Sequence, residues 1–311
     1  MMGIERKFKR PFPRLWIGVL FVSLILSIRC GLLKNDESFR FVFMTDIHVQ
    51  PELRGAEGFE SAIDHVNGLM PKPAFAITGG DLVMDVLSQT YGRADSLYTL
   101  FQQTAQRFEM PVHNCIGNHE HFGLNSRGGV SPDHPEYGKR MFMNRLGEGR
   151  TYRSFDHGKW HFVLLDGVGM IPGRGYFGQV DSLQLVWLKE DLERIGPDRP
   201  VVLALHIPLY SVRIQFRDGP LASNGRGSVV TNADDVWKIC RQYNVKLVLQ
   251  GHLHVVEEIV WRGTHFVNAG AVSGAWWKGP NEDFEEGFVV VDVKGDDFTW
   301  RYEPYGWNAE N

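Results

Sequence analysis

Five apolar segments of this chain stop abruptly at residues that can bind a metal, and this repeated ending constrains the fold more than any other feature. The clearest case is residues 110–116, which run into Gly117-Asn118-His119-Glu120. A buried strand presents side chains to a site in this way, at its carboxyl end. The other segments are 39–45 before Asp46 and His48, 74–78 before Asp81, 200–205 before His206, and 245–250 before His252 and His254.

The polar residues at these five ends offer oxygen and nitrogen ligands and no thiolate. Such a set suits two ions of Fe, Mn, Zn or Co better than Mg or Ca. Asp81 stands alone at its strand end, so we expect its carboxylate to bridge two cations held about 3.5–4 Å apart. A hydroxide bridging the two ions would be the nucleophile of a hydrolytic reaction. The predicted metal ligands are Asp46, His48, Asp81, Asn118, His206, His252 and His254.

His119 follows directly on Asn118, and neighbouring residues on extended backbone point in different directions. We therefore expect its side chain to face the substrate rather than the metals. An imidazole placed there can donate a proton to the leaving group or stabilise developing charge. His121 lies close to the same motif. For this residue, as for the other histidines outside the five endings, we expect a structural role.

Apolar residues at helical spacing separate the predicted strands. Residues 57–70 and 94–107 are predicted helices between the first three strands, and this β-α-β-α-β order favours parallel pairing. Two more helices are predicted at 179–195 and 233–243. Short turns between the last strands indicate a mostly antiparallel C-terminal part. The remaining strands are predicted at 151–156, 159–166, 257–261, 264–268, 287–293 and 298–302.

Two long irregular segments, 121–150 and 207–232, adjoin the predicted site. We expect substrate specificity to lie in them, although for 121–150 a plain surface loop is an equal alternative. The net charge is −4, and no basic cluster lies outside the N-terminus, so no nucleic-acid partner is expected. The three cysteines do not form a disulfide framework.

The N-terminus has the pattern of an export signal. Five basic residues between Arg6 and Arg14 precede an apolar run at 15–28, which is short for a transmembrane helix. Cys30 could carry a lipid, although Arg29 stands where lipoprotein signals usually have a small residue. A cleaved signal, a lipid anchor and an uncleaved membrane anchor are all open. We expect an exported protein of the periplasm or cell envelope, with a signal or anchor at 1–30, a linker at 31–38 and a globular domain at 39–311.

The five endings, in this order, resemble the motifs of the calcineurin-like metallophosphoesterases. The resemblance covers about residues 39–302. It is strongest to bacterial cyclic-nucleotide phosphodiesterase-like and purple-acid-phosphatase-like members. It implies an α/β fold, a four-layer α/β/β/α sandwich of two mixed sheets with a dinuclear metal site at the strand ends. It also implies that one metal is held by Asp46, His48, Asp81 and His254, and the other by Asp81, Asn118, His206 and His252.

Departures from the family pattern narrow the expected activity. Purple acid phosphatases have a tyrosine ligand three residues after the bridging aspartate, where this chain has Met84. Ser/Thr protein phosphatases have an arginine in the stretch that here reads Met84-Asp85-Val86, so activity on phosphoproteins is not expected. The resemblance implies a metal-dependent hydrolase of a small-molecule phosphate ester, in the first place a phosphodiesterase. The alternatives are a phosphomonoesterase on the same site and a non-catalytic scaffold of the same fold.

Overall fold

Alternating side chains along β1 (Ser38–Met44) place hydrophobic cores on both faces of one sheet. Phe41 and Phe43 join one core, Val42 and Met44 join another, and all four are fully buried. Successive side chains of a strand point to opposite faces, so a continuously apolar strand must be covered on both sides. The computed structural model describes residues 38–309 of the chain.

Two mixed sheets pack face to face, with aromatic side chains such as Phe41, Phe75 and Phe162 between them. The first sheet has the strand order β13-β12-β1-β2-β3, and the second has the order β10-β11-β9-β8-β5-β4. The other strands of the first sheet are β2 (Phe75–Thr78), β3 (Val112–Asn114), β12 (Gly287–Lys294) and β13 (Asp297–Pro304). Those of the second sheet are β4 (Arg153–His157), β5 (Trp160–Leu164), β8 (Val201–Ala204), β9 (Val245–Gln250), β10 (Val256–Trp261) and β11 (Thr264–Ala269).

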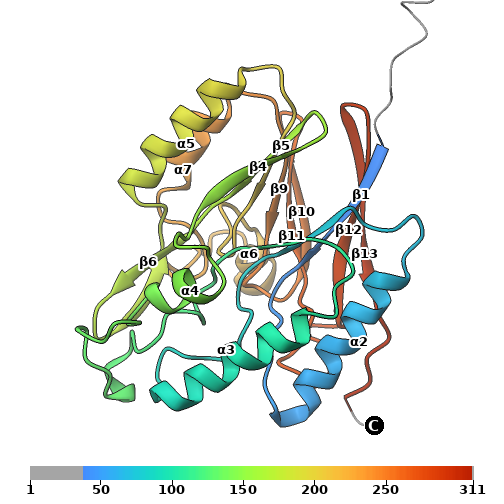
Figure 1. Cartoon of the computed structure of the whole chain (residues 1–311). Helices are drawn as coiled ribbons and strands as arrows, with labels where there is room; N and C mark the ends of the chain where they lie inside the picture. Colours follow the sequence, from blue (N-terminus) through green and yellow to red (C-terminus); the bar gives the residue numbers. More distant parts are fainter. Residues whose placement is uncertain (1–37, 310–311) are drawn as a thin grey trace, which may run out of the picture. The chain divides into compact units, whose positions relative to one another are not determined.

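Helices cover the outer face of each sheet, as Figure 1 shows. The helices α2 (Gly55–Gly68) and α3 (Tyr91–Ala105) pack on the first sheet, and α5 (Ser182–Ile195) and α7 (Ala233–Cys240) pack on the second. The predicted four-layer α/β/β/α sandwich of two mixed sheets is therefore confirmed.

Parallel pairing brings the carboxyl ends of the strands near the site to one edge. β1 is parallel to β2, and β2 is parallel to β3. In the second sheet, β8 is parallel to β9. The helices α2 and α3 make the crossovers that parallel strands need. Each of the five polar endings of the sequence follows one of these five strands.

The strand predicted at 110–116 differs from expectation. Only Val112–Asn114 forms a strand, and β3 is half-buried at the edge of its sheet rather than buried within it. Pro111 has no N–H to donate to a ladder, which limits the strand at its start. Cys115 and Ile116 are fully buried, as predicted, but they lie beyond the strand. The apolar run therefore leads into the site without being a strand along its whole length.

Several short elements carry too few residues to give a periodic signal. They are the hairpin β6 (Val168–Ile171) and β7 (Gly175–Gly178), the helices α4 (Arg140–Arg145) and α6 (Arg213–Asp218), and the 3-10 turns η1 (Glu52–Arg54) and η2 (Ser126–Gly128). Within residues 38–309, no helix has the length and apolar content needed to cross a membrane. The signal or anchor predicted at 1–30 and the linker up to residue 37 lie outside the described residues, and Ser38 belongs to β1.

Candidate metal centre

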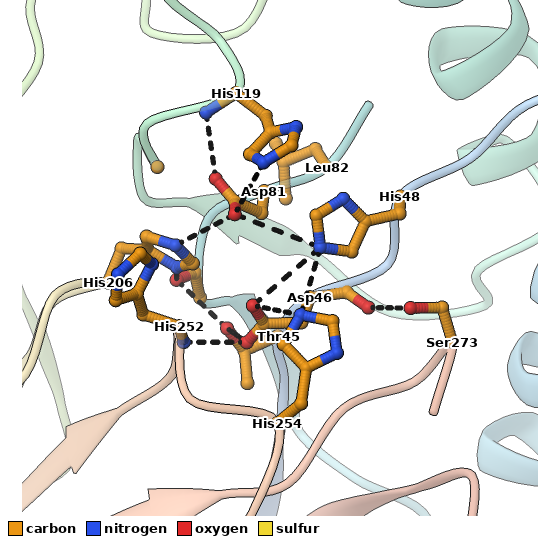
Figure 2. A network of polar contacts seen from close by, with 12 residues as sticks. Thr45, Asp46, His48, Asp81, Leu82, His119, His206, His252, His254 and Ser273 are labelled. Carbon is orange, nitrogen blue, oxygen red and sulfur yellow. Dashed lines mark hydrogen bonds and ion pairs between the residues drawn. The ribbon is translucent and has the colours of Figure 1, made fainter. Parts of the chain in front are cut away.

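Side chains from both sheets converge at the edge where the parallel strands end (Figure 2). Three overlapping groups have their potential ligand atoms within 4.8 Å of one another. Six of the seven predicted ligands, and His119, are thus brought together. The three groups are Asp46, His48 and His254; Asp81, His206 and His252; and His48, Asp81 and His119.

Backbone carbonyls closely approach three of the four histidines predicted as ligands, and the fourth, His48, has its Nδ1 3.4 Å from the Met84 carbonyl. The other three are His206, His252 and His254. In each, one ring nitrogen lies 2.6–2.9 Å from a carbonyl oxygen, which leaves the other nitrogen to face the centre. The free Nε2 of His206 lies 3.1 Å from Oδ2 of Asp81, and that of His254 lies 3.1 Å from Oδ1 of Asp46. Metal-binding histidines are held in this way by outer partners. The carbonyl partners are Gly79 for His206, Gly227 for His252 and Gly274 for His254.

The donor atoms at the centre fit bound cations. The Nε2 atoms of His48 and His254 lie 3.1 Å apart, while Nδ1 of each faces a backbone carbonyl. If both Nδ1 atoms carry the proton, the two Nε2 lone pairs face each other, and a cation between them removes the repulsion. Burial lowers the pKa of His48 and His252 to about 4, so both are neutral, as metal ligands must be. Three further buried atoms make no hydrogen bond to any described residue: Oδ1 of Asp46, Oδ1 of Asn118 and Nε2 of His206.

Two ionised carboxylates and a protonated histidine share the centre in the absence of a cation. Burial raises the pKa of Asp81, but His206 and His119 outweigh it and hold that pKa well below its usual range. The pKa of Asp46 is likewise lowered, against burial, by His254 and His206. Burial lowers the pKa of His206, but Asp81 and Asp46 raise it to about 9. Both carboxylates are therefore ionised at neutral pH, and His206 holds a proton that a bound cation would replace.

Five of the predicted ligands have left-handed backbone. Their φ angles are 55° for Asp46, 47° for His48, 50° for Asp81, 71° for His252 and 54° for His254. Residues other than glycine rarely adopt this conformation, which costs of order 1–3 kcal/mol at each position. Strain of this kind concentrates at functional sites, where the surrounding structure maintains it.

Glu120 maintains the turn that carries Asp81. Its Oε2 accepts hydrogen bonds from the backbone N–H groups of Asp81 and Gly117, at 2.9 and 2.7 Å. Its Oε1 accepts from Leu82 and Val83, at 2.7 and 3.2 Å. Gly117 has no room for a side chain, because a Cβ there would lie 2.2 Å from the Asp81 nitrogen. The fully buried Glu120 thus ties together two of the five strand ends.

Thr45 and Gly251 fix Asp46 in a similar way. The Thr45 hydroxyl donates to Oδ2 of Asp46 at 2.8 Å, and the His252 N–H donates to the same oxygen at 2.9 Å. A Cβ on Gly251 would lie 2.1 Å from the Thr45 hydroxyl oxygen, so the close approach requires glycine. Sequence reasoning gave no role to Glu120, because its partners are backbone N–H groups and leave no pattern in the sequence. It gave none to Thr45 either, whose partner is the side chain of the neighbouring Asp46.

His119 lies at the outer side of the centre. Its backbone N–H donates to Oδ1 of Asp81 at 2.9 Å, and its Nδ1 is hydrogen-bonded to the carbonyl of Met84. Nε2 then faces the centre, 3.7 Å from Oδ2 of Asp81. The side chain is 21% exposed, against 0–4% for Asp46, His48, Asp81, His206 and His254. This exposure suits the predicted contact with substrate, although His119 is also near enough to Asp81 and His48 to bind a metal.

The two irregular segments differ in their relation to the centre. Segment 207–232 reaches it through the Gly227 carbonyl, 2.9 Å from Nε2 of His252. Segment 121–150 is tied to α3 through an ion pair of Arg145 with Asp95 at 2.7 Å. Its His121 is fully buried, and neither ring nitrogen is hydrogen-bonded to a described residue. Burial lowers the pKa of His121 to about 4, and it belongs to none of the three ligand groups.

Comparison with family models identifies one family for this chain. A family model described as calcineurin-like phosphoesterase matches residues 39–256. The probable glycerophosphodiester phosphodiesterase GpdQ of Arcobacter nitrofigilis is 27% identical over 210 residues, which cover 65% of this chain and 64% of that protein. The 3',5'-cyclic-nucleotide phosphodiesterase alr5338 of Nostoc sp. is 26% identical over 219 residues, which cover 68% of this chain and 70% of that protein. The chain thus spans just under two thirds of the length of the Arcobacter protein.

A solved structure shares the fold. A dimetal phosphatase from Danio rerio matches with a TM-score of 0.57 at 14% identity, over 86% of this chain and 99% of that chain. At this identity the likeness concerns the fold alone.

Proposed function

Because the chain belongs to the calcineurin-like phosphoesterase family, we propose that it is a metal-dependent hydrolase of phosphodiesters. The observation that carries this proposal is the convergence of carboxylate and imidazole groups from both sheets at one edge. Both curated relatives are named as phosphodiesterases, one for glycerophosphodiesters and one for cyclic nucleotides, which supports a diester substrate. No part of the proposal requires a nucleic-acid partner.

The residues present would hold two ions of Fe, Mn, Zn or Co, because their donors are carboxylate, imidazole and amide groups. Asp46, His48 and His254 would serve one ion, Asn118, His206 and His252 the other, and Asp81 both. When bound, such ions lower the pKa of a coordinated water to near neutrality and neutralise charge on the phosphate.

His119 would transfer a proton to the departing alcohol. Its Nδ1 is engaged by the Met84 carbonyl, so the proton for the leaving group would come from Nε2. The backbone bond to Asp81 fixes the distance between this donor and the predicted bridging carboxylate. All predicted ligands except His252 are buried, which keeps water from the back of the site, while the partial exposure of His119 leaves access for substrate.

A substrate panel on metal-reconstituted protein tests the proposal. We expect turnover of aryl phosphodiesters, with phosphomonoesters hydrolysed more slowly. Faster hydrolysis of monoesters would make the chain a phosphatase on the same site. No turnover of any ester by protein that holds two metals would favour the scaffold alternative. Cyclic nucleotides and glycerophosphodiesters in the same panel separate the two activities named for the relatives.

We further propose that the protein is exported and associates with the cell envelope through residues 1–30. The support is the basic and apolar pattern of this segment. Cell fractionation and mass spectrometry of the N-terminus test it. Unprocessed full-length protein in the cytosol would contradict export, and the mass at Cys30 separates a lipid anchor from a cleaved or uncleaved terminus.

A further inference from the structure

The β11–β12 loop, residues 270–286, forms one wall of the candidate centre, and it lies outside the residues that match the family model. The loop contacts Asp46, His48 and His254, which form one of the three groups of candidate ligands. These contacts fix backbone and ring orientation and do not themselves supply ligands. They run from the Ser273 hydroxyl to the Asp46 carbonyl at 2.7 Å, from Nδ1 of His254 to the Gly274 carbonyl at 2.6 Å, and from the Trp277 indole N–H to the His48 carbonyl at 2.9 Å.

Two consecutive tryptophans of this loop have left-handed backbone, with φ of 54° for Trp276 and 69° for Trp277. Such a conformation is exceptional for a bulky residue and calls for a compensating role. Trp277 has one in the core, where it is 1% exposed and donates to the His48 carbonyl. Trp276 is 38% exposed, so core packing does not account for its large side chain.

The indole of Trp276 lies at the mouth of the candidate centre. Its ring centroid is 4.6 Å from that of His254, with the planes inclined by 37°, and 6.0 Å from that of His48. The ring of His119, the predicted proton donor, contacts the same His48 at 4.7 Å. His119 and Trp276 thus share His48 as a neighbour, so a planar ring carried by an alcohol that leaves toward His119 could extend to the exposed indole.

We propose that Trp276 forms the leaving-group subsite and selects phosphodiesters whose departing alcohol carries a planar aromatic or heteroaromatic ring. This inference rests on the proposed phosphodiesterase function. An exposed indole face stacks on flat rings, and this contact has no equivalent for a compact aliphatic alcohol. His119 then supplies the proton while Trp276 holds the ring of the departing group.

Paired substrates test the proposal on full-length, metal-loaded protein. Two methyl phosphodiesters are compared, one with an aryl leaving group and one with a fluorinated alkyl leaving group of matched acidity. For Trp276→Ala, we expect kcat/KM on the aryl diester to fall by about 5- to 150-fold, the factor expected for one lost stacking contact. The ratio of kcat/KM for the aryl diester to that for the alkyl diester should fall by the same factor. Trp276→Phe should keep most of the wild-type ratio. Trp261, an exposed tryptophan of β10, gives the matched control Trp261→Ala, which should change neither rate.

Binding provides a readout that is independent of turnover. Calorimetry with non-hydrolysable aryl and alkyl phosphonates should show that Trp276→Ala weakens the aryl ligand selectively, at unchanged metal content. An equal fall on both ligands, or loss of metal, would mean that the indole only supports His254, and the proposal would be wrong. If the proposed function itself fails, wild-type protein hydrolyses neither diester, and selective phosphonate binding still decides the role of Trp276.

Discussion

Glu120→Gln tests whether one buried carboxylate holds the strand end that carries Asp81. The carboxylate accepts four backbone N–H groups, two on each oxygen. A glutamine can keep the pair from Leu82 and Val83 on its one carbonyl oxygen. Its amide NH₂ then faces the N–H groups of Asp81 and Gly117, and these two buried donors lose their acceptor.

The expected loss of folding stability follows from those two unsatisfied N–H donors. An unsatisfied buried N–H costs about 1–3 kcal/mol, so Glu120→Gln should lower the free energy of unfolding by about 2–6 kcal/mol. For a domain of this size, that corresponds to a fall in Tm of roughly 4–10 °C. Because the freed turn also carries the strained Asp81, the affinity for metal should fall too.

Calorimetric melting of metal-free protein measures this prediction. Burial and the neighbouring Asp81 raise the pKa of Glu120 to about 7, so the measurement is made at a pH of about 8, where the wild-type carboxylate is ionised. Glu109→Gln is the matched control, because Glu109 is 54% exposed and its ion pair with Lys72 is worth at most about 1 kcal/mol. If Glu120→Gln has the same Tm as the control variant and the same metal affinity as the wild type, the Glu120 carboxylate does not hold this turn.

Three further predictions concern the centre itself. Asp81→Asn should lower both metal occupancy and rate, and full activity with two metals bound would exclude the bridging role. His119→Ala should keep both metals and lose about 10²- to 10⁴-fold in rate on substrates with poor leaving groups, with a smaller loss when the leaving group is nitrophenolate. Loss of a metal in this variant would make His119 a ligand. Equal rate losses for good and poor leaving groups would exclude a general acid. Since Asp81 and Asp46 raise the pKa of His206 to about 9, metal-free protein carries this proton at neutral pH and must release it on binding metal. The affinity for metal should therefore rise with pH up to about 9. Calorimetry of metal binding in two buffers of different ionisation enthalpy should detect the released proton at neutral pH. If no proton is released, His206 does not carry one in the metal-free protein.

The positions of the candidate ligands could be read from the sequence because they follow from chain geometry. Parallel strands end at one edge of a sheet, so the residue that follows each apolar run is placed there whatever the details of packing. The parallel pairing of the first strands could be predicted from their β-α-β-α-β order, whereas the four-layer sandwich was expected from the resemblance to the calcineurin-like metallophosphoesterases. The position of β3 at the edge of its sheet could not be predicted. Strand order depends on which faces pack together, and the residues at 110–116 do not indicate an edge strand.

The groups that hold the candidate ligands in place were decided by tertiary structure alone. Glu120 acts on N–H groups 37–39 residues away, apart from that of Gly117. Trp277 acts on a carbonyl 229 residues away. Backbone N–H and carbonyl groups are the same at every position, so a side chain that binds them gives no complementary residue to search for. The sequence thus indicates the chemistry of the candidate site through the types of its predicted ligands. The strained backbone geometry of the site arises only when distant segments pack against one another.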